Sequence, residues 1–108
     1  MALDGGSHPD ESVAASLHDA TLLHIELDWP GGSAAVRFRA VPGVAVVLRA
    51  SGVLGVSVPR RHPWGPSISV NSAHLSRSQD GTDRLDIEMQ SGDAIVVEAS
   101  NLVLQSDT

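Results

Sequence analysis

Apolar and polar residues alternate with a period of two along most of the chain from residue 20 onward. In a β-strand, successive side chains point to opposite faces of the sheet, so this alternation is typical of strands that bury one face. The first such run places four large apolar residues on one face: Leu23, Ile25, Leu27 and Trp29. The pattern therefore predicts β-structure for the body of the chain.

Turn residues divide the alternating region at intervals of about 8–12 residues, a spacing that is typical of sandwiches and barrels. The intervening segments predict seven or eight short strands, at 20–29, 33–40, 44–51, 52–59, 67–78, 83–90, 94–100 and 101–105. No helical pattern is long enough for a crossover between parallel strands. We therefore expect an all-β, single-domain antiparallel meander that forms a β-sandwich or a small open barrel, which the pattern does not separate.

Residues 20–40 predict a first β-hairpin, with Gly31 and Gly32 as a two-residue loop. The apolar residues of both strands then share one face, and an opposite-charge pair falls on the other, as cross-strand pairing favours. The same register directs Trp29 inward. Its cross-strand pairs are Trp29–Ala34, Leu27–Val36, Ile25–Phe38 and, on the polar face, Glu26–Arg37.

A second hairpin is predicted around the sequence QSG at 90–92. A three-residue loop with Gly92 in the left-handed conformation connects two strands without steric cost, because glycine lacks a Cβ atom. The resulting cross-strand pairs are Ile87–Ile95, Leu85–Val97 and Arg84–Glu98.

Two irregularities are expected inside strands. Gly52 and Gly55 indicate a bulge or sharp coiling. The apolar positions after residue 70 change parity, which predicts a bulge near Asn71–Ser72. In the segment that begins at Gly52, the residues expected to face inward are Leu54, Val56 and Val58.

The two ends of the chain are more polar than its body. We expect a weakly ordered N-terminal tail at 1–16, one β-domain at 17–104 and a C-terminal tail at 105–108. The first residues have neither the basic nor the apolar region of a secretory signal, and no run approaches the roughly 18 apolar residues of a membrane span. Together with the absence of cysteine, this predicts a cytoplasmic location and no membrane partner.

The charge balance is acidic, with 7 basic and 13 acidic residues and a formal net charge of −6. All the basic residues are arginine. A nucleic-acid partner is not expected, because such proteins carry a basic surface that neutralises phosphates.

No catalytic or metal-binding signature is present. The histidines lack the spacing of a zinc site, and no G-x-S-x-G elbow surrounds a serine. Asp86 and Glu88 lie two residues apart on one strand face, where solvated carboxylates are expected. The sequence therefore predicts no catalytic residues, no metal site and no cofactor.

The stretch RRHPWGPSISVN, Arg60 to Asn71, is the most unusual segment of the chain. In one interpretation it is a rigid corner, stiffened by its prolines, whose Trp64 fills the end of the core. In the other it is a recognition surface, since tryptophan and arginine are enriched at interface hot spots. The two interpretations are compatible. The candidate binding residues are Arg60, Arg61, His62 and Trp64.

A family resemblance is carried by four stretches: LHDATLLHIELDW, an RFRA-type second strand, PWGPSISVN and a closing LDIEMQSGDAIVVEA. Over about residues 17–99, the chain resembles a small bacterial family of uncharacterised single-domain proteins that is similar to immunity protein 50. The resemblance implies a cytoplasmic antidote that binds a toxin. It carries no established functional residues onto this sequence.

We therefore expect a non-enzymatic protein-binding module, with a toxin or a second copy of the chain as partner. Homodimerisation would cover an exposed strand edge, which lysine does not protect here. The alternative is a β-domain that binds a small molecule or carbohydrate in a pocket near Trp64.

Overall fold

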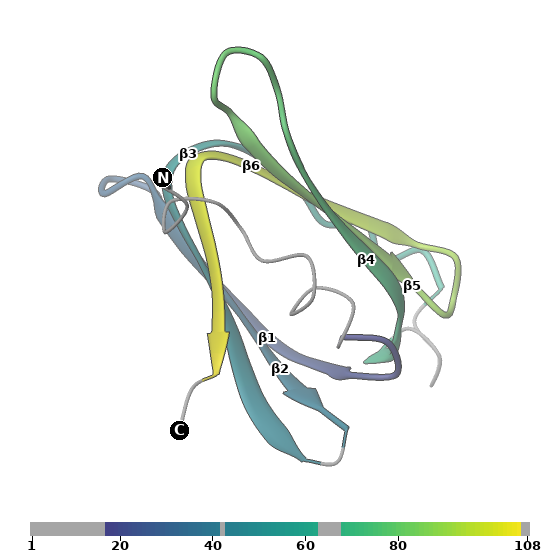
Figure 1. Cartoon of the computed structure of the whole chain (residues 1–108). Coiled ribbons are helices and arrows are strands. Elements are labelled where there is room, and N and C mark those ends of the chain that lie inside the picture. The colour runs from purple at the N-terminus through teal and green to yellow at the C-terminus, as the bar shows by residue number, and fades with distance from the viewer. Residues whose placement is uncertain (1–16, 42, 63–67, 107–108) are drawn as a thin grey trace.

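The computed structural model describes residues 17–41, 43–62 and 68–106, which form one antiparallel sheet of six strands in the order β1-β2-β3-β6-β5-β4 (Figure 1). The strands are β1 (Thr21–Asp28), β2 (Ser33–Ala40), β3 (Val44–Ser57), β4 (Val70–Arg77), β5 (Asp83–Met89) and β6 (Ala94–Ser106). The expected all-β class is confirmed. The topology is two three-stranded meanders joined by the β3–β6 pair, because the chain crosses from β3 to the far edge before β4.

The described residues contain six strands instead of seven or eight because β3 and β6 each span two predicted strands. Core-facing positions change parity from Ala50 to Val53 in β3 and from Ala99 to Leu102 in β6. A change in parity normally marks the end of a strand. Here the paired strands β3 and β6 both change which alternate residues face the core, at the same point along the sheet, and both strands continue beyond it.

This shared irregularity centres on Gly52, which has φ +62° and lies between the paired residues Ser51–Asn101 and Val53–Ala99. The register shifts between Val53 and Gly55. The bulge or sharp coiling that these glycines predict is therefore present, as a bulge. Figure 1 shows β6 bending sharply along its length, so that the two ends of the sheet face each other.

The sheet is folded on itself but remains open between its edge strands, β1 and β4. In the part of the chain that the structure describes, a bridge joins these edges at Thr21 and Ser69. The Val70 N–H donates to the Ala20 carbonyl oxygen at 2.8 Å, and the Asp19 N–H donates to the Val70 carbonyl oxygen at 2.8 Å. One end of the opening is therefore closed by backbone hydrogen bonds.

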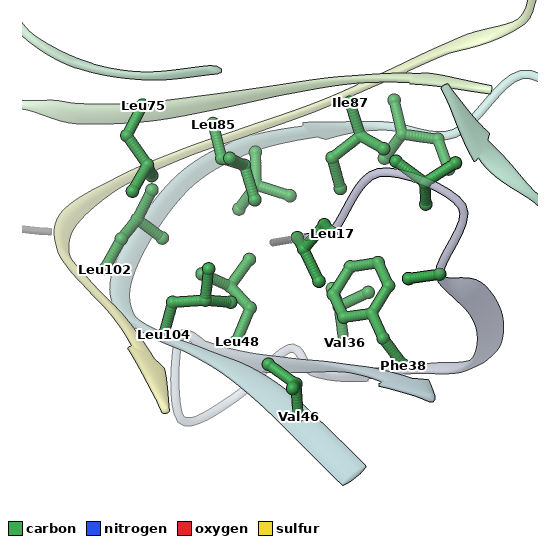
Figure 2. Packing of buried hydrophobic residues seen from close by; sticks show 14 of the residues in the cluster. Leu17, Val36, Phe38, Val46, Leu48, Leu75, Leu85, Ile87, Leu102 and Leu104 are labelled. Carbon is green, nitrogen blue, oxygen red and sulfur yellow. The ribbon is translucent and has the colours of Figure 1, made fainter. Parts of the chain in front are cut away.

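The hydrophobic core lies between the facing halves of the sheet (Figure 2). Leu75, Leu85 and Ile87 point into it from β4 and β5, and side chains from β2, β3 and β6 meet them. Leu17, which precedes β1, is fully buried between the two halves. The residues labelled on the opposite half of the core are Val36, Phe38, Val46, Leu48, Leu102 and Leu104.

The β5–β6 hairpin has the predicted register. Gly92 has φ +98°, its N–H donates to the Met89 carbonyl oxygen at 2.9 Å, and the Met89 N–H donates to the Asp93 carbonyl oxygen at 2.8 Å. These bonds define the expected three-residue loop. The confirmed pairs are Ile87–Ile95, Leu85–Val97 and Arg84–Glu98, and in the last the Nη1–Oε2 distance is 3.4 Å.

The predicted register of the β1–β2 hairpin is wrong by two residues. Asp28 pairs with Ser33, so the loop has four residues. The Gly32 N–H donates to the Trp29 carbonyl oxygen at 3.2 Å, and Pro30 occupies the second turn position, which proline favours. Trp29 therefore sits in the turn with 81% of its surface exposed, instead of facing the core.

Because the shift is an even number of residues, the faces of β1 are preserved despite the wrong pairing. Ile25 faces Val36, and Glu26 faces Ala35. The Arg37 Nη2 atom still lies 3.9 Å from Glu26 Oε1. A bulge between Leu22 and His24 exposes Leu23, which was expected to face inward.

The expected inward face of the second half of β3 is also wrong. Leu54 and Val58 are exposed, whereas Val53 packs against the core together with Val56. Val53 faces the core because the core-facing parity changes across Gly52, where the backbone has a positive φ. The bulge between Val53 and Gly55 then returns Val56 to the core side. The predicted bulge near Asn71–Ser72 is confirmed by a register shift between Val70 and Ser72.

An ion pair with a buried carboxylate fixes β5 between its neighbours. Asp83 is fully buried, and the Arg77 Nε–H donates to its Oδ1 at 2.6 Å. Its second oxygen accepts the Leu102 N–H at 3.1 Å. The carboxylate therefore links β4, β5 and the second half of β6 near the bend.

We expect Asp83→Asn to lower the free energy of unfolding by about 1–3 kcal/mol, because one amide oxygen cannot replace two carboxylate acceptors and a buried donor loses its partner. Urea denaturation of the variant and wild type measures this difference. Asp86→Asn, which removes an exposed carboxylate from the same strand, should have a much smaller effect. Equal effects would contradict the role assigned to Asp83.

We expect Gly52→Ala to cost more stability than Gly32→Ala, although both glycines have nearly the same φ, +62° and +66°. The left-handed conformation alone costs about 1–2 kcal/mol. At Gly52 the added Cβ would also lie 2.7 Å from Ser100 Oγ, whereas nothing lies within 4 Å at Gly32. This overpacking adds about 1–3 kcal/mol.

Thermal and urea denaturation of the two glycine variants separate the steric cost from the backbone cost. Ser100→Gly in the Gly52→Ala background should recover the steric part. If both single variants lose the same stability, the close contact does not constrain the bend.

Candidate functional site

The candidate corner begins where β3 ends and is fixed by a buried carboxylate. Asp93 lies between the β5–β6 loop and β6, with 6% of its surface exposed. Its Oδ1 accepts the Arg61 N–H at 3.3 Å, and its Oδ2 accepts the His62 N–H at 3.2 Å. Ser91 Oγ lies 3.2 Å from the same Oδ2. One side chain therefore holds the backbone of the Arg-Arg-His segment.

The ionised form of Asp93 is the form that makes these contacts. Burial opposes its charge and raises its pKa, but the N–H groups of His62 and Arg61 and the Ser91 hydroxyl lower it, and the net pKa lies below the ordinary value of 3.8. The carboxylate is therefore charged at neutral pH and accepts bonds from two successive backbone N–H groups.

The structure brings three of the four predicted binding residues to one exposed place. The side chains of Arg60, Arg61 and His62 are all exposed. Trp64, whose burial in the core was the alternative role of this segment, lies outside the described residues. The corner thus has a backbone fixed from within and basic side chains that face outward.

A hollow of about 320 Å³ lies beside this corner, between β1 and the end of β3. Its floor is apolar, with the buried side chains of Met89 and Ile95. Arg60 and His24 lie among its polar lining residues, together with Asp93. The full lining consists of residues 22–25, residues 58–60, Ile68, Met89, Asp93 and Ile95.

Within the described ranges, no group of three or more His, Cys, Asp or Glu residues is placed to hold a metal ion. His18 lies 3.6 Å from Asp19, and His24 lies 3.4 Å from Glu26, and both pairs are exposed. No helix in the same part of the chain is long and apolar enough to cross a membrane.

Sequence reasoning missed Asp93, the residue that positions the site. In the sequence it follows Ser91 and Gly92, and an aspartate after a turn glycine is ordinarily read as part of the turn. Its partners are about thirty residues away, at Arg61 and His62. A pattern of neighbouring residues does not predict a hydrogen bond between residues so far apart in the sequence.

Comparison with protein-family models and with curated proteins gives no match. Among solved structures, the chain is similar to an uncharacterized protein from Neisseria gonorrhoeae, with a TM-score of 0.62 and 15% sequence identity. The alignment covers 81% of this chain and 90% of that chain. At this identity the likeness concerns the fold, because one fold hosts many unrelated functions.

The Asp93 contacts predict a pH-dependent contribution to stability. The unfolded chain protonates this carboxyl near pH 3.8, and the folded protein does so at lower pH. The contribution is therefore present above pH 3.8 and is lost as the pH falls through the folded-state pKa.

Asp93→Asn removes this titration, so we expect wild type to melt above the variant at pH 6 and the difference in Tm to narrow toward pH 3. Thermal melts of both proteins in matched buffers measure it. A difference that stays constant between pH 6 and pH 3 would contradict the role of the ionised carboxylate.

Proposed function

We propose that this protein is a non-enzymatic, cytoplasmic protein-binding module of the immunity type, which binds a toxin through the corner formed by Arg60, Arg61 and His62. The observation that carries the proposal is the Asp93 carboxylate, which fixes the backbone of the corner while the side chains are exposed. A surface ordered before binding loses less conformational entropy when the partner arrives.

The charge of the corner supports a protein partner with an acidic surface. Two arginines and a histidine are consecutive here, in a chain whose formal net charge is −6. Arginine forms bidentate hydrogen bonds with carboxylates and is enriched at hot spots. A local basic cluster on an acidic protein also favours one orientation of approach.

A second candidate function is binding of a small molecule or carbohydrate. It is favoured by the hollow beside Arg60, whose volume of about 320 Å³ falls at the lower end of the range of ligand pockets. An apolar floor with a few polar groups at the rim is the usual composition of such sites.

The test of the protein-binding function is the double variant Arg60→Ala with Arg61→Ala. Candidate partners are the proteins encoded beside the gene, and their binding is measured by isothermal titration calorimetry. We expect affinity to fall by at least about thirtyfold, the loss of one hot spot. Tm should change little, because the variant keeps the backbone N–H groups of Arg61 and His62 that donate to Asp93.

The matched control is Arg39→Ala with Arg49→Ala, which removes two exposed arginines from β2 and β3. It should leave affinity unchanged. Asp93→Asn should weaken binding although both corner arginines remain, because their backbone is released.

The two candidate functions give opposite results in a pull-down from the native host and in a thermal-shift screen of sugars and metabolites. A captured toxin whose binding depends on Arg60 and Arg61 supports the first. If no protein is retained and a metabolite raises Tm by several degrees, the protein-binding function is wrong and the small-molecule function replaces it.

A further inference from the structure

The hollow beside the candidate corner has an apolar floor and an apolar mouth. Its floor is formed by the side chains of Met89 and Ile95, which are 2% and 3% exposed. At its mouth three large apolar residues keep 47%, 49% and 44% of their surface exposed: Leu23, Ile68 and Val58. Exposed apolar residues that gather at one place, instead of being scattered singly, indicate a surface that another molecule covers.

The volume of the hollow indicates the size of the apolar group that it holds. The hollow measures about 320 Å³, whereas a closed apolar cavity of about 150 Å³ takes up one benzene ring. Because this hollow is open at its mouth, an apolar body of roughly eight to ten carbon atoms fills it and leaves space for a polar group at the mouth.

An arginine stands at this mouth without a carboxylate partner in the described part of the chain. Arg60 lines the hollow and is exposed, and no hydrogen bond or ion pair joins its guanidinium to another described residue. Arg77 and Arg84, in contrast, pair with carboxylates at 2.6 Å and 3.0 Å. The positive charge of Arg60 is therefore available to a ligand whose apolar part lies in the hollow.

The other two titratable side chains of the lining, Asp93 and His24, are already engaged by the protein. Asp93 accepts the backbone N–H groups of Arg61 and His62, one on each oxygen. The His24 ring lies 3.4 Å from a carboxylate outside the lining. Asp93 is 6% exposed, so its negative charge opposes an anion deep in the hollow. An anionic group of a ligand therefore lies at the mouth, beside Arg60.

We propose that the hollow binds a small amphipathic carboxylate, with its apolar body over Met89 and Ile95 and its carboxylate on Arg60. Burial of the apolar body supplies most of the affinity. The guanidinium donates two parallel N–H bonds to the carboxylate and fixes the orientation of the ligand. This inference rests on the second of the two proposed functions, and it uses the side chain of Arg60 but not that of Arg61.

The first test is titration of the full, isotope-labelled chain with octanoate, octan-1-ol and octyltrimethylammonium, followed in amide NMR spectra. The three probes share one apolar chain and differ in the charge of the head group. We expect octanoate to shift the resonances of residues 22–25 and 58–60, with a Kd of about 1 mM or tighter. Octan-1-ol should bind about threefold to fivefold more weakly, which is the contribution of an exposed ion pair, and the cation should bind most weakly.

The second test removes the charge at the mouth. Arg60→Ala should lower the affinity for octanoate by about threefold to fivefold and leave the affinity for octan-1-ol unchanged. The matched control is Arg61→Ala, which removes the neighbouring exposed arginine that does not line the hollow. The control should bind both probes like wild type. It also separates this inference from the protein-binding function, in which both arginines contact the partner.

The third test removes apolar surface from the mouth. Val58→Ser should weaken the binding of octanoate and octan-1-ol alike, by about threefold or more. The matched control is Leu54→Ser on β3, which removes an apolar side chain that is 65% exposed and does not line the hollow. In the wild type, each methylene added between hexanoate and octanoate should raise the affinity by up to about fourfold.

Equal affinity of the wild type for octanoate and octan-1-ol, or an equal loss of octanoate binding in Arg60→Ala and Arg61→Ala, overturns the inference while the hollow remains a small-molecule site. The absence of saturable shifts at residues 22–25 and 58–60 with all three probes also overturns it. The thermal-shift screen of sugars and metabolites then decides separately whether the small-molecule function fails as well.

Discussion

The long antiparallel pair of β3 and β6 determines the rest of the structure. It is the pair that joins the two meanders, and both strands bend and change their core-facing parity at the level of Gly52. The bend requires glycine there, because the backbone has a positive φ and the Ser100 side chain occupies the space of a Cβ atom. A single open sheet can therefore fold over one core.

The position of the candidate site follows from this bend. Folding the sheet brings the edge strand β1 beside the end of β3 and leaves an opening that residues 58–60 border. Asp93, which directly precedes β6, lies at the same place and accepts hydrogen bonds from the backbone of Arg61 and His62. The folding of one sheet thus forms both the hollow and the basic corner. The hollow is a space lined largely by apolar side chains, and the corner carries exposed basic side chains.

Much of the fold was predictable because strand alternation and turn chemistry act locally. The β5–β6 hairpin was correct because Gly92 fixes both loop length and register. The β1–β2 hairpin was wrong by two residues because two glycines and a proline permit loops of different length, and the apolar faces agree in both registers. The strand count was too high because a parity change inside a strand looks like its end.

The sequence by itself determined the β class and the faces of most strands, and it marked Arg60–His62 as a candidate segment. Only the tertiary structure decided that Asp93 fixes this segment, that Asp83 links three strands with Arg77, and that Trp29 lies in an exposed turn. The physical reason is the separation in sequence between the residues that interact. Alternation and turn preference depend on neighbours in sequence, whereas a buried carboxylate is satisfied by donors that the fold alone brings within hydrogen-bonding distance.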